Sequence, residues 1–302
     1  MTETADSALK GLKHGDTISV IAPAGPVTHE EIQPAIEILK QKGFKIQEGR
    51  HLYDRQGYLA GKDSDRLDDL YMAFEDSSIR AIICARGGYG TPRLLDKIDF
   101  EIIKKNPKLL IGFSDITALL LAITCKTGLP VWHGPMLRSP DGREQNLERL
   151  VYILSSKGEI DLKLEEKNVL KKGMARGKLM GGNLALLSSL IGTPYLPDFT
   201  DSILFLEDIA EPVYRIDRMI TQLRLAGILK NVRGILAGYF QDCGEADVIN
   251  GLLLESLEGD CPMYSGFPTG HGKENYPLPF GVEAELNTEA LTLKVDPFID
   301  LE

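Results

Sequence analysis

Residues 108–121, KLLIGFSDITALLL, contain the pattern from which the rest of the sequence is interpreted. The short apolar run at the start of this stretch predicts a buried strand, and the run 116–123, which lacks Gly and Pro, predicts a buried helix. Ser114 lies at the turn between them. A hydroxyl on a sharp strand-to-helix turn is held out of the sheet beside free backbone N–H groups, as an acyl-transfer serine requires. The stretch departs from G-x-S-x-G at Ile116, so a Ser114 or Asp115 that only caps the helix is the alternative.

The composition predicts a folded protein with one large domain or two ordinary ones. The chain has 302 residues, of which 43% are hydrophobic, and a formal net charge of -10. This acidic balance, without a basic tract, argues against nucleic acid or an anionic membrane as a partner. Residues 1–13 are polar and no run reaches the roughly 18 apolar residues of a membrane helix, so we expect a cytoplasmic protein.

Strands and helices alternate through the first half of the chain, which predicts an α/β fold with a parallel sheet and right-handed crossovers. Expected elements are the strands 16–23, 44–47 and 81–85, a helix that Thr28 opens with Glu31 at capping-box spacing, and a helix at 62–75. The carboxyl ends of parallel strands share one rim of the sheet. Gly87 and Gly88, after the third strand, should therefore lie near Ser114.

A charged stretch at 157–175 is expected to connect two domains. The first domain, residues 1–156, carries Ser114. The second domain, residues 176–302, is expected to contain helices, strands and a terminal hairpin: helices at 183–191, 213–225 and 248–257, strands at 202–206 and 235–240, and a hairpin of 282–286 with 290–295.

An activated serine needs a base and a group that orients the base. Of the five histidines, we favour His271 over His133, because His271 stands between two glycines in a long loop without a clear period, and such loops are usually functional or mobile. Glu207 and Asp208 follow an apolar strand, so either could orient the base. Both acids also fit a solvated strand end or a helix cap.

Other classes of protein fit the sequence less well. The loop Gly87-Gly88-Tyr89-Gly90 could hold a phosphate, but it lacks the G-x-G-x-x-G and P-loop patterns. Metal-dependent hydrolysis is disfavoured, because H-E-x-x-H is absent and the histidines are far apart. We therefore expect neither a metal nor another cofactor. A nucleotide-binding α/β protein and a non-catalytic protein that binds a small molecule remain alternatives.

Five short motifs, taken in order, resemble those of the LD-carboxypeptidase family of serine peptidases, the muramoyl-tetrapeptide carboxypeptidases. They are Arg86-Gly87-Gly88-Tyr89-Gly90, Gly112-Phe113-Ser114-Asp115, Met180-Gly181-Gly182-Asn183-Leu184, Leu206-Glu207-Asp208 and Gly270-His271-Gly272. The resemblance implies that Ser114 is the nucleophile and that Glu207 and His271 complete the triad. It also implies that the backbone amides of Asp115 and Gly88 form the oxyanion hole.

The same resemblance implies a reaction and an architecture. The reaction is cleavage of the bond between the L-centre of meso-diaminopimelate and the terminal D-Ala of murein tetrapeptide, in the cytoplasm, during peptidoglycan recycling. The architecture is a flavodoxin-like N-terminal domain, a smaller β-rich C-terminal domain and a homodimer. A related branch hydrolyses microcin C-type peptide–nucleotide antibiotics and has a longer loop before the histidine, so the short segment between Glu207 and His271 favours the carboxypeptidase. Arg86 and Arg138 are candidates to bind the free carboxylate of the substrate.

Overall fold

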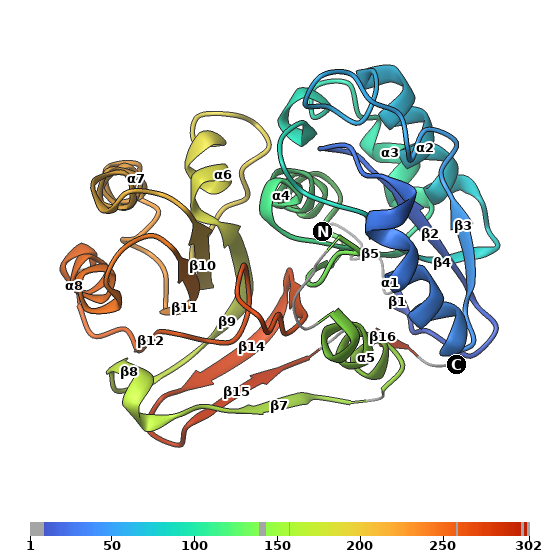
Figure 1. Cartoon of the computed structure of the whole chain (residues 1–302). Helices are drawn as coiled ribbons and strands as arrows, with labels where there is room; N and C mark the ends of the chain where they lie inside the picture. Colours follow the sequence, from blue (N-terminus) through green and yellow to red (C-terminus); the bar gives the residue numbers. More distant parts are fainter. Residues whose placement is uncertain (1–8, 139–142, 157, 258, 297–298, 301–302) are drawn as a thin grey trace, which may run out of the picture.

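The computed structural model describes residues 9–138, 143–156, 158–257, 259–296 and 299–300. The first eight residues of the polar start therefore lie outside the described residues. Two sheets organise the chain, one built mainly from the first half and one from the second half (Figure 1). A short parallel pair, β1 (Leu9–Lys10) with β16 (Ile299–Asp300), joins segments near the two ends of the chain. The expectation of an α/β protein with two domains is confirmed.

The first sheet has six strands in the order β13-β6-β5-β4-β2-β3. Five of them are parallel: β2 (Thr17–Ile21), β3 (Lys45–Glu48), β4 (Ile79–Cys84), β5 (Leu109–Gly112) and β6 (Val131–His133). Numbered among themselves these five follow the order 2-1-3-4-5, which is the flavodoxin-like arrangement. The carboxyl ends of β2, β4 and β5 therefore lie side by side, next to the point where the strand order reverses.

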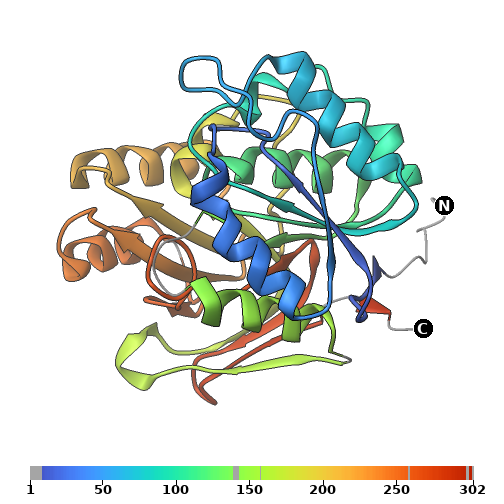
Figure 2. The same ribbon diagram turned by 45° about the vertical axis from the view of Figure 1, so that its right-hand side comes forward.

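Helices cover both faces of this sheet (Figure 2). They are α1 (His29–Gln41), α2 (Asp63–Glu75), α3 (Phe100–Lys105), α4 (Thr117–Thr127) and α5 (Arg143–Leu154). One buried cluster joins α1 and α5 to the sheet through Ile36 and Leu150, and another includes α2, α3 and α4. Helix α1 begins with the expected capping box, in which Thr28 and Glu31 each bind the backbone N–H of the other.

The second sheet has eight strands in the order β7-β15-β14-β9-β10-β11-β12-β8. Its parallel part consists of β9 (Met174–Asn183), β10 (Ile203–Ile209), β11 (Gly234–Gln241) and β12 (Met263–Tyr264). The antiparallel strands are β14 (Val282–Asn287), β15 (Thr292–Val295), β7 (Ile160–Lys163) and β8 (Val169–Lys171). Three helices accompany the parallel part: α6 (Leu184–Ser189), α7 (Val213–Leu225) and α8 (Ala246–Ser256). The stretch 157–175 thus supplies the two edge strands of this sheet.

The two halves of the chain are joined in two ways. Helix α4 lies between the two sheets (Figure 1), and a continuous buried cluster connects its Leu119 with Leu187 of α6 and Phe205 of β10. In addition β13 (Leu278–Phe280), from the second half of the sequence, pairs antiparallel with β6 of the first sheet. The ends of β5 and β10 are held in a fixed relation as a result.

Several elements differ in detail from those expected. The helix at 213–225 and the terminal hairpin are confirmed. The strand expected at 202–206 instead runs to Ile209, so Glu207 and Asp208 lie inside β10, where the pairing register with β11 shifts between Leu206 and Asp208. Among the described helices, none is long and apolar enough to cross a membrane.

We expect Thr28→Ala to lower the free energy of unfolding by about 1 kcal/mol, because it leaves a backbone N–H at the start of α1 without its side-chain acceptor. Thr28→Ser keeps an oxygen at the same place and should retain most of the stability. Urea unfolding of the three proteins measures the difference. An equal loss in both variants would contradict a capping role for the hydroxyl.

Candidate active site

Ser114 occupies a strained turn after β5. It begins the one-turn 3₁₀ segment Ser114–Ile116, which continues directly into α4. Its φ of 62° lies in the left-handed region, which a residue with a side chain adopts at a cost and which often marks a functional site. Ser114 is partly exposed, and its hydroxyl has no hydrogen bond to another described residue. The turn therefore presents an unengaged hydroxyl at the rim of the first sheet.

The glycine loop after β4 packs directly against this turn. A Cβ on Gly87 would lie 2.8 Å from the Ser114 Cβ and 3.3 Å from the Asp115 nitrogen, so the close approach requires glycine. The Gly87 carbonyl accepts a hydrogen bond of 2.9 Å from Gly25 N–H. Because a trans peptide points its C=O and N–H in opposite directions, the Gly88 N–H faces away from Gly25. The loop and the amide of Asp115 thus meet beside Ser114, as the strand order predicted, and these are the segments that the family resemblance implies as oxyanion donors.

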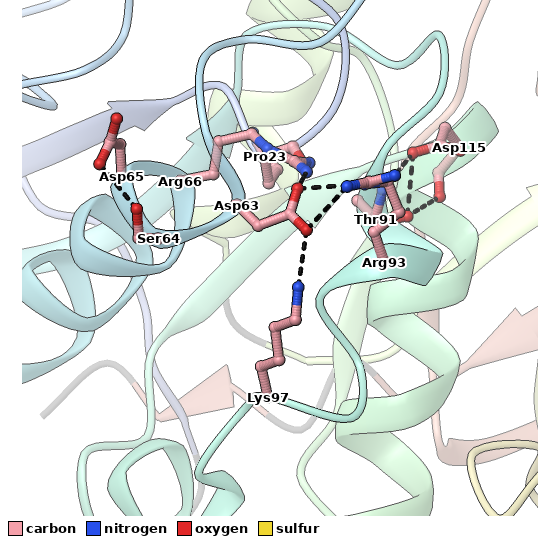
Figure 3. A network of polar contacts seen from close by, with 9 residues as sticks. All are labelled: Pro23, Asp63, Ser64, Asp65, Arg66, Thr91, Arg93, Lys97 and Asp115. Carbon is pink, nitrogen blue, oxygen red and sulfur yellow. Dashed lines mark hydrogen bonds and ion pairs between the residues drawn. The ribbon is translucent and has the colours of Figure 1, made fainter.

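Hydrogen bonds between Asp115 and Thr91 connect the serine turn to the glycine loop (Figure 3). Its Oδ2 accepts the Thr91 N–H at 2.8 Å, and the Thr91 hydroxyl donates to the Asp115 carbonyl at 2.5 Å. Both residues are buried. Thr91 follows the glycine loop, so its hydrogen bonds with Asp115 fix that loop relative to the serine turn. Sequence reasoning did not single out Thr91, whose only signal is its place after Gly90.

A buried arginine supports the other side of the glycine loop. Arg66 of α2 is 1% exposed, donates to the Pro23 carbonyl at the end of β2, and bonds to Asp63 at 2.6 Å. Asp63 also binds Arg93 and Lys97 (Figure 3). Hydrogen bonds from Arg93, then from Lys97 and Arg66, hold the pKa of Asp63 well below its usual value. The helix expected at 62–75 therefore contributes a partly buried ion pair beside the glycine loop.

Glu207, which is buried, and His271, which is partly exposed, form a pair next to the serine turn. The carboxylate of Glu207 has none of its surface exposed, and its Oε2 lies 2.7 Å from His271 Nδ1. Burial lowers the pKa of His271, but the hydrogen bond and charge of Glu207, helped by Asp208, more than compensate and raise it above the usual value. The ring of His271 packs on Phe113, the residue before Ser114, with 4.8 Å between centroids. With Nδ1 engaged by Glu207, Nε2 is the nitrogen left for another partner.

Asp208, the rival acid, has a different role. Its oxygens accept hydrogen bonds from Asn183 Nδ2 and from the backbone N–H groups of Ala185 and Ile209, at 2.8 to 2.9 Å. It therefore anchors the beginning of α6. Burial, with the neighbouring charge of Glu207, raises the pKa of Asp208 to about 6.

His133, the rival base, is enclosed by aromatic rings. It is fully buried among Phe113, Phe205 and Phe280, and neither ring nitrogen has a partner among the described residues. Burial lowers the pKa of His133 to about 4, so this residue is neutral at pH 7. It lies behind the serine turn as part of the core.

The two arginine candidates differ in their partners. Arg86 is half-buried, donates to the Pro26 carbonyl at 2.9 Å, and forms no ion pair with a carboxylate of the described chain. Its Nε lies 3.7 Å from where a Cβ on Gly88 would be. Burial and the charge of Arg138 lower the pKa of Arg86. Arg138, by contrast, is already paired with Glu31 at 2.6 Å.

Comparison with known proteins defines the class as a peptidase built from two domains. Residues 18–134 match the LD-carboxypeptidase N-terminal domain, and residues 176–286 match the LD-carboxypeptidase C-terminal domain. The chain therefore belongs to the LD-carboxypeptidase family.

Individual relatives cover nearly the whole chain. The probable murein peptide carboxypeptidase of Bacillus subtilis is 38% identical over 298 residues, which cover 95% of this chain and 93% of that protein. The murein tetrapeptide carboxypeptidase of Pseudomonas aeruginosa is 34% identical over 291 residues, with 91% and 94% covered. The structure of MccF in complex with glutamyl sulfamoyl guanosine superposes with a TM-score of 0.90 at 27% identity, over 97% of this chain and 99% of that one.

The raised pKa of Asp208 predicts how stability depends on pH. The folded protein holds this proton up to a pH of about 6, whereas the unfolded chain releases it near 3.8, so the unfolding free energy should fall as the pH rises between these values. Asp208→Asn should flatten that fall in urea titrations from pH 4 to 6.5. Asp198→Asn is the control, because Asp198 lies at an exposed turn where hydrogen bonds lower its pKa. This variant should keep the fall in unfolding free energy with rising pH. An unchanged slope in Asp208→Asn would contradict the assignment.

Proposed function

We propose that this protein is a serine carboxypeptidase in which Ser114, His271 and Glu207 act together. The observation that carries the proposal is the hydrogen bond between the buried Glu207 and His271, packed beside a strained serine turn. A base oriented by a buried carboxylate, next to a nucleophile and two candidate oxyanion amides, is the arrangement that acyl transfer needs. The missing Ser114–His271 hydrogen bond does not count against it, because such bonds often tighten only when substrate binds.

In the proposed mechanism His271 Nε2 accepts the Ser114 proton as the hydroxyl oxygen attacks the scissile carbonyl. The Asp115 and Gly88 amides stabilise the resulting oxyanion, and Glu207 holds the imidazole tautomer and stabilises its cation. His271 then gives the proton to the departing amine, which leaves an acyl-enzyme. Water, deprotonated by His271, hydrolyses this ester and restores Ser114. Apart from substrate and water, each step uses groups of this chain alone. The hydrogen bond between Thr91 and Asp115 holds the Gly88 and Asp115 amides in position relative to each other.

The proposed substrate is murein tetrapeptide, cleaved between meso-diaminopimelate and the terminal D-Ala. Relatives named as murein peptide carboxypeptidases are 34% to 38% identical to this chain, whereas MccF is 27% identical. A cytoplasmic homodimer that acts in peptidoglycan recycling completes the proposal. Arg86 is the better candidate for the terminal carboxylate, because it is an unpaired, half-buried cation against Gly88, while Arg138 is neutralised by Glu31.

The alternative function is hydrolysis of a microcin C-type peptide–nucleotide conjugate. It is supported by the match to MccF over nearly the whole chain. The two functions share the serine chemistry and differ in the leaving group, so they are separated by substrate. A non-catalytic binding protein on this fold would show no turnover that depends on Ser114.

The direct test is release of D-Ala from L-Ala-γ-D-Glu-meso-diaminopimelate-D-Ala, detected by mass spectrometry. We expect the wild type to release D-Ala with or without EDTA, and Ser114→Ala to lose about 10⁴-fold or more in rate. Release by folded Ser114→Ala at the wild-type rate would exclude Ser114 as the nucleophile. Absence of release by the wild type would exclude this substrate, and a peptidyl sulfamoyl nucleoside would then test the alternative.

Arg86→Gln should raise KM for the tetrapeptide about tenfold, with a smaller change in kcat, because a charge-assisted contact to the substrate carboxylate is lost. Arg86→Lys should recover part of the loss, and Arg138→Gln should have less effect. A tetrapeptide that ends in D-alaninamide is the matched control. The wild type should have a higher KM for this amide than for the free acid, whereas Arg86→Gln should have similar KM values for both. If Arg86→Gln still prefers the free carboxylate to the amide, a residue other than Arg86 binds the substrate carboxylate.

A further inference from the structure

The loop that carries His271 lies across helix α5 of the first domain. We define the histidine loop as residues 266–277, between β12 and β13. Asn146 of α5 makes two hydrogen bonds with it: Asn146 Nδ2 donates to the Lys273 carbonyl at 2.9 Å, and Asn146 Oδ1 accepts the Asn275 N–H at 3.0 Å. Asn146 is 3% exposed. One buried amide side chain thus satisfies backbone groups of the loop that are more than 120 residues away in sequence.

The contact continues from Asn275 to the residue before His271. Asn275 Oδ1 accepts the Gly270 N–H at 3.1 Å, and Asn275 is itself 3% exposed. Gly270 has a φ of 109° and lies so close to the acid that a Cβ would be 2.6 Å from Glu207 Oε2. The two asparagines therefore fix the backbone that leads into His271 at the place where it meets the carboxylate.

Two further contacts hold the same side of the loop on the first domain. The Arg149 guanidinium, one turn after Asn146 on α5, stacks on the Tyr276 ring at 3.6 Å from its centroid. Strand β13, which begins at Leu278, pairs with β6. The carboxylate that orients His271 belongs to the second domain, and the start of the loop pairs with β11 through the Phe267 N–H and the Thr269 carbonyl, whereas the part after His271 is held by the first domain.

We infer that Asn146 is a positioning residue for His271, acting through Asn275 and Gly270. This inference rests on the proposed serine–histidine mechanism. Buried amides are costly unless they are hydrogen-bonded, and both polar atoms of the Asn146 side chain are satisfied by the histidine loop rather than by its own domain. Proton transfer depends steeply on geometry, so a small displacement of the imidazole should slow the chemical step with little effect on binding.

The test measures how fast a fluorophosphonate phosphonylates Ser114: the serine oxygen bonds to phosphorus, fluoride leaves and His271 takes the serine proton, so the reaction needs His271 but not the natural substrate. We expect Asn146→Ala to lower the maximal labelling rate at least about tenfold and to leave the half-saturating concentration within about twofold. Asn275→Ala should give a similar loss. The double variant should be no slower than the slower single variant, because both residues act through one chain of contacts. On tetrapeptide, the same loss should appear in kcat and not in KM.

Leu150→Ala is the matched control. Leu150 lies on α5, buried in the core away from the histidine loop, so its truncation should lower the melting temperature at least as much while labelling stays near the wild-type rate. If Leu150→Ala slows labelling as much as Asn146→Ala, the role is only structural and the inference is wrong. Wild-type labelling rates in both asparagine variants, or additive losses in the double variant, would also overturn it.

Failure of the proposed function gives a different result. If the wild type is not labelled at Ser114, the serine–histidine mechanism is wrong and the positioning role falls with it. If the wild type is labelled but does not cleave the tetrapeptide, only the substrate is wrong, and the labelling rates still decide the role of Asn146. Should Asn146→Ala fail to fold, Asn275→Ala carries the same comparison, because it removes the bond to Gly270 directly.

Discussion

The hydrogen bond between Glu207 and His271 is the interaction on which the candidate site depends. A carboxylate with no exposed surface is expensive to bury, and here its Oε2 is bonded to one imidazole, while Oε1 has no partner among the described residues. The pair is stable only if His271 stays in place. Much of the surrounding structure does this: Phe113 packs on one face of the ring, Gly270 allows the loop to approach the acid, and α5 holds the loop.

The candidate catalytic residues come from two sheets. The serine turn and the glycine loop come from adjacent parallel strands of the first sheet, so their proximity follows from strand order. The acid comes from β10 of the second sheet and the histidine from a loop that returns to the first sheet. Helix α4 and the buried cluster around it fix the position of the carboxyl ends of β5 and β10 relative to each other. A rigid interface between domains takes the place of the single sheet that usually carries such a group of residues.

Local patterns predicted most of the elements. The helix at 213–225, the capping box at Thr28 and the hairpin depend on neighbours in sequence, and they are present as expected. Glu207 was expected at a strand end but lies within β10, because pairing with β9 continues to Glu207 and pairing with β11 to Ile209, beyond the apolar pattern that ends at Leu206.

What the sequence could not supply depends on distant contacts. Strand β13 has three residues, one of them Pro279, and becomes a strand only because the edge of β6 is available. Thr91 and Asn146 look like ordinary polar residues until folding places them against Asp115 and the histidine loop. The strand–turn–helix pattern pointed to Ser114 and the loop context favoured His271 over His133, but only the family motifs chose Glu207 over Asp208 for the proposed triad.

Strand β13 also sets an order of events for folding. The first sheet is complete only when residues 278–280 pair with β6, and about nine-tenths of the chain precedes them. A nascent chain emerging from the ribosome can assemble the five parallel strands early, but the edge of β6 stays open until residues 278–280 have emerged. The last pairing, which brings the histidine loop to α5, is therefore also the step that assembles the candidate site.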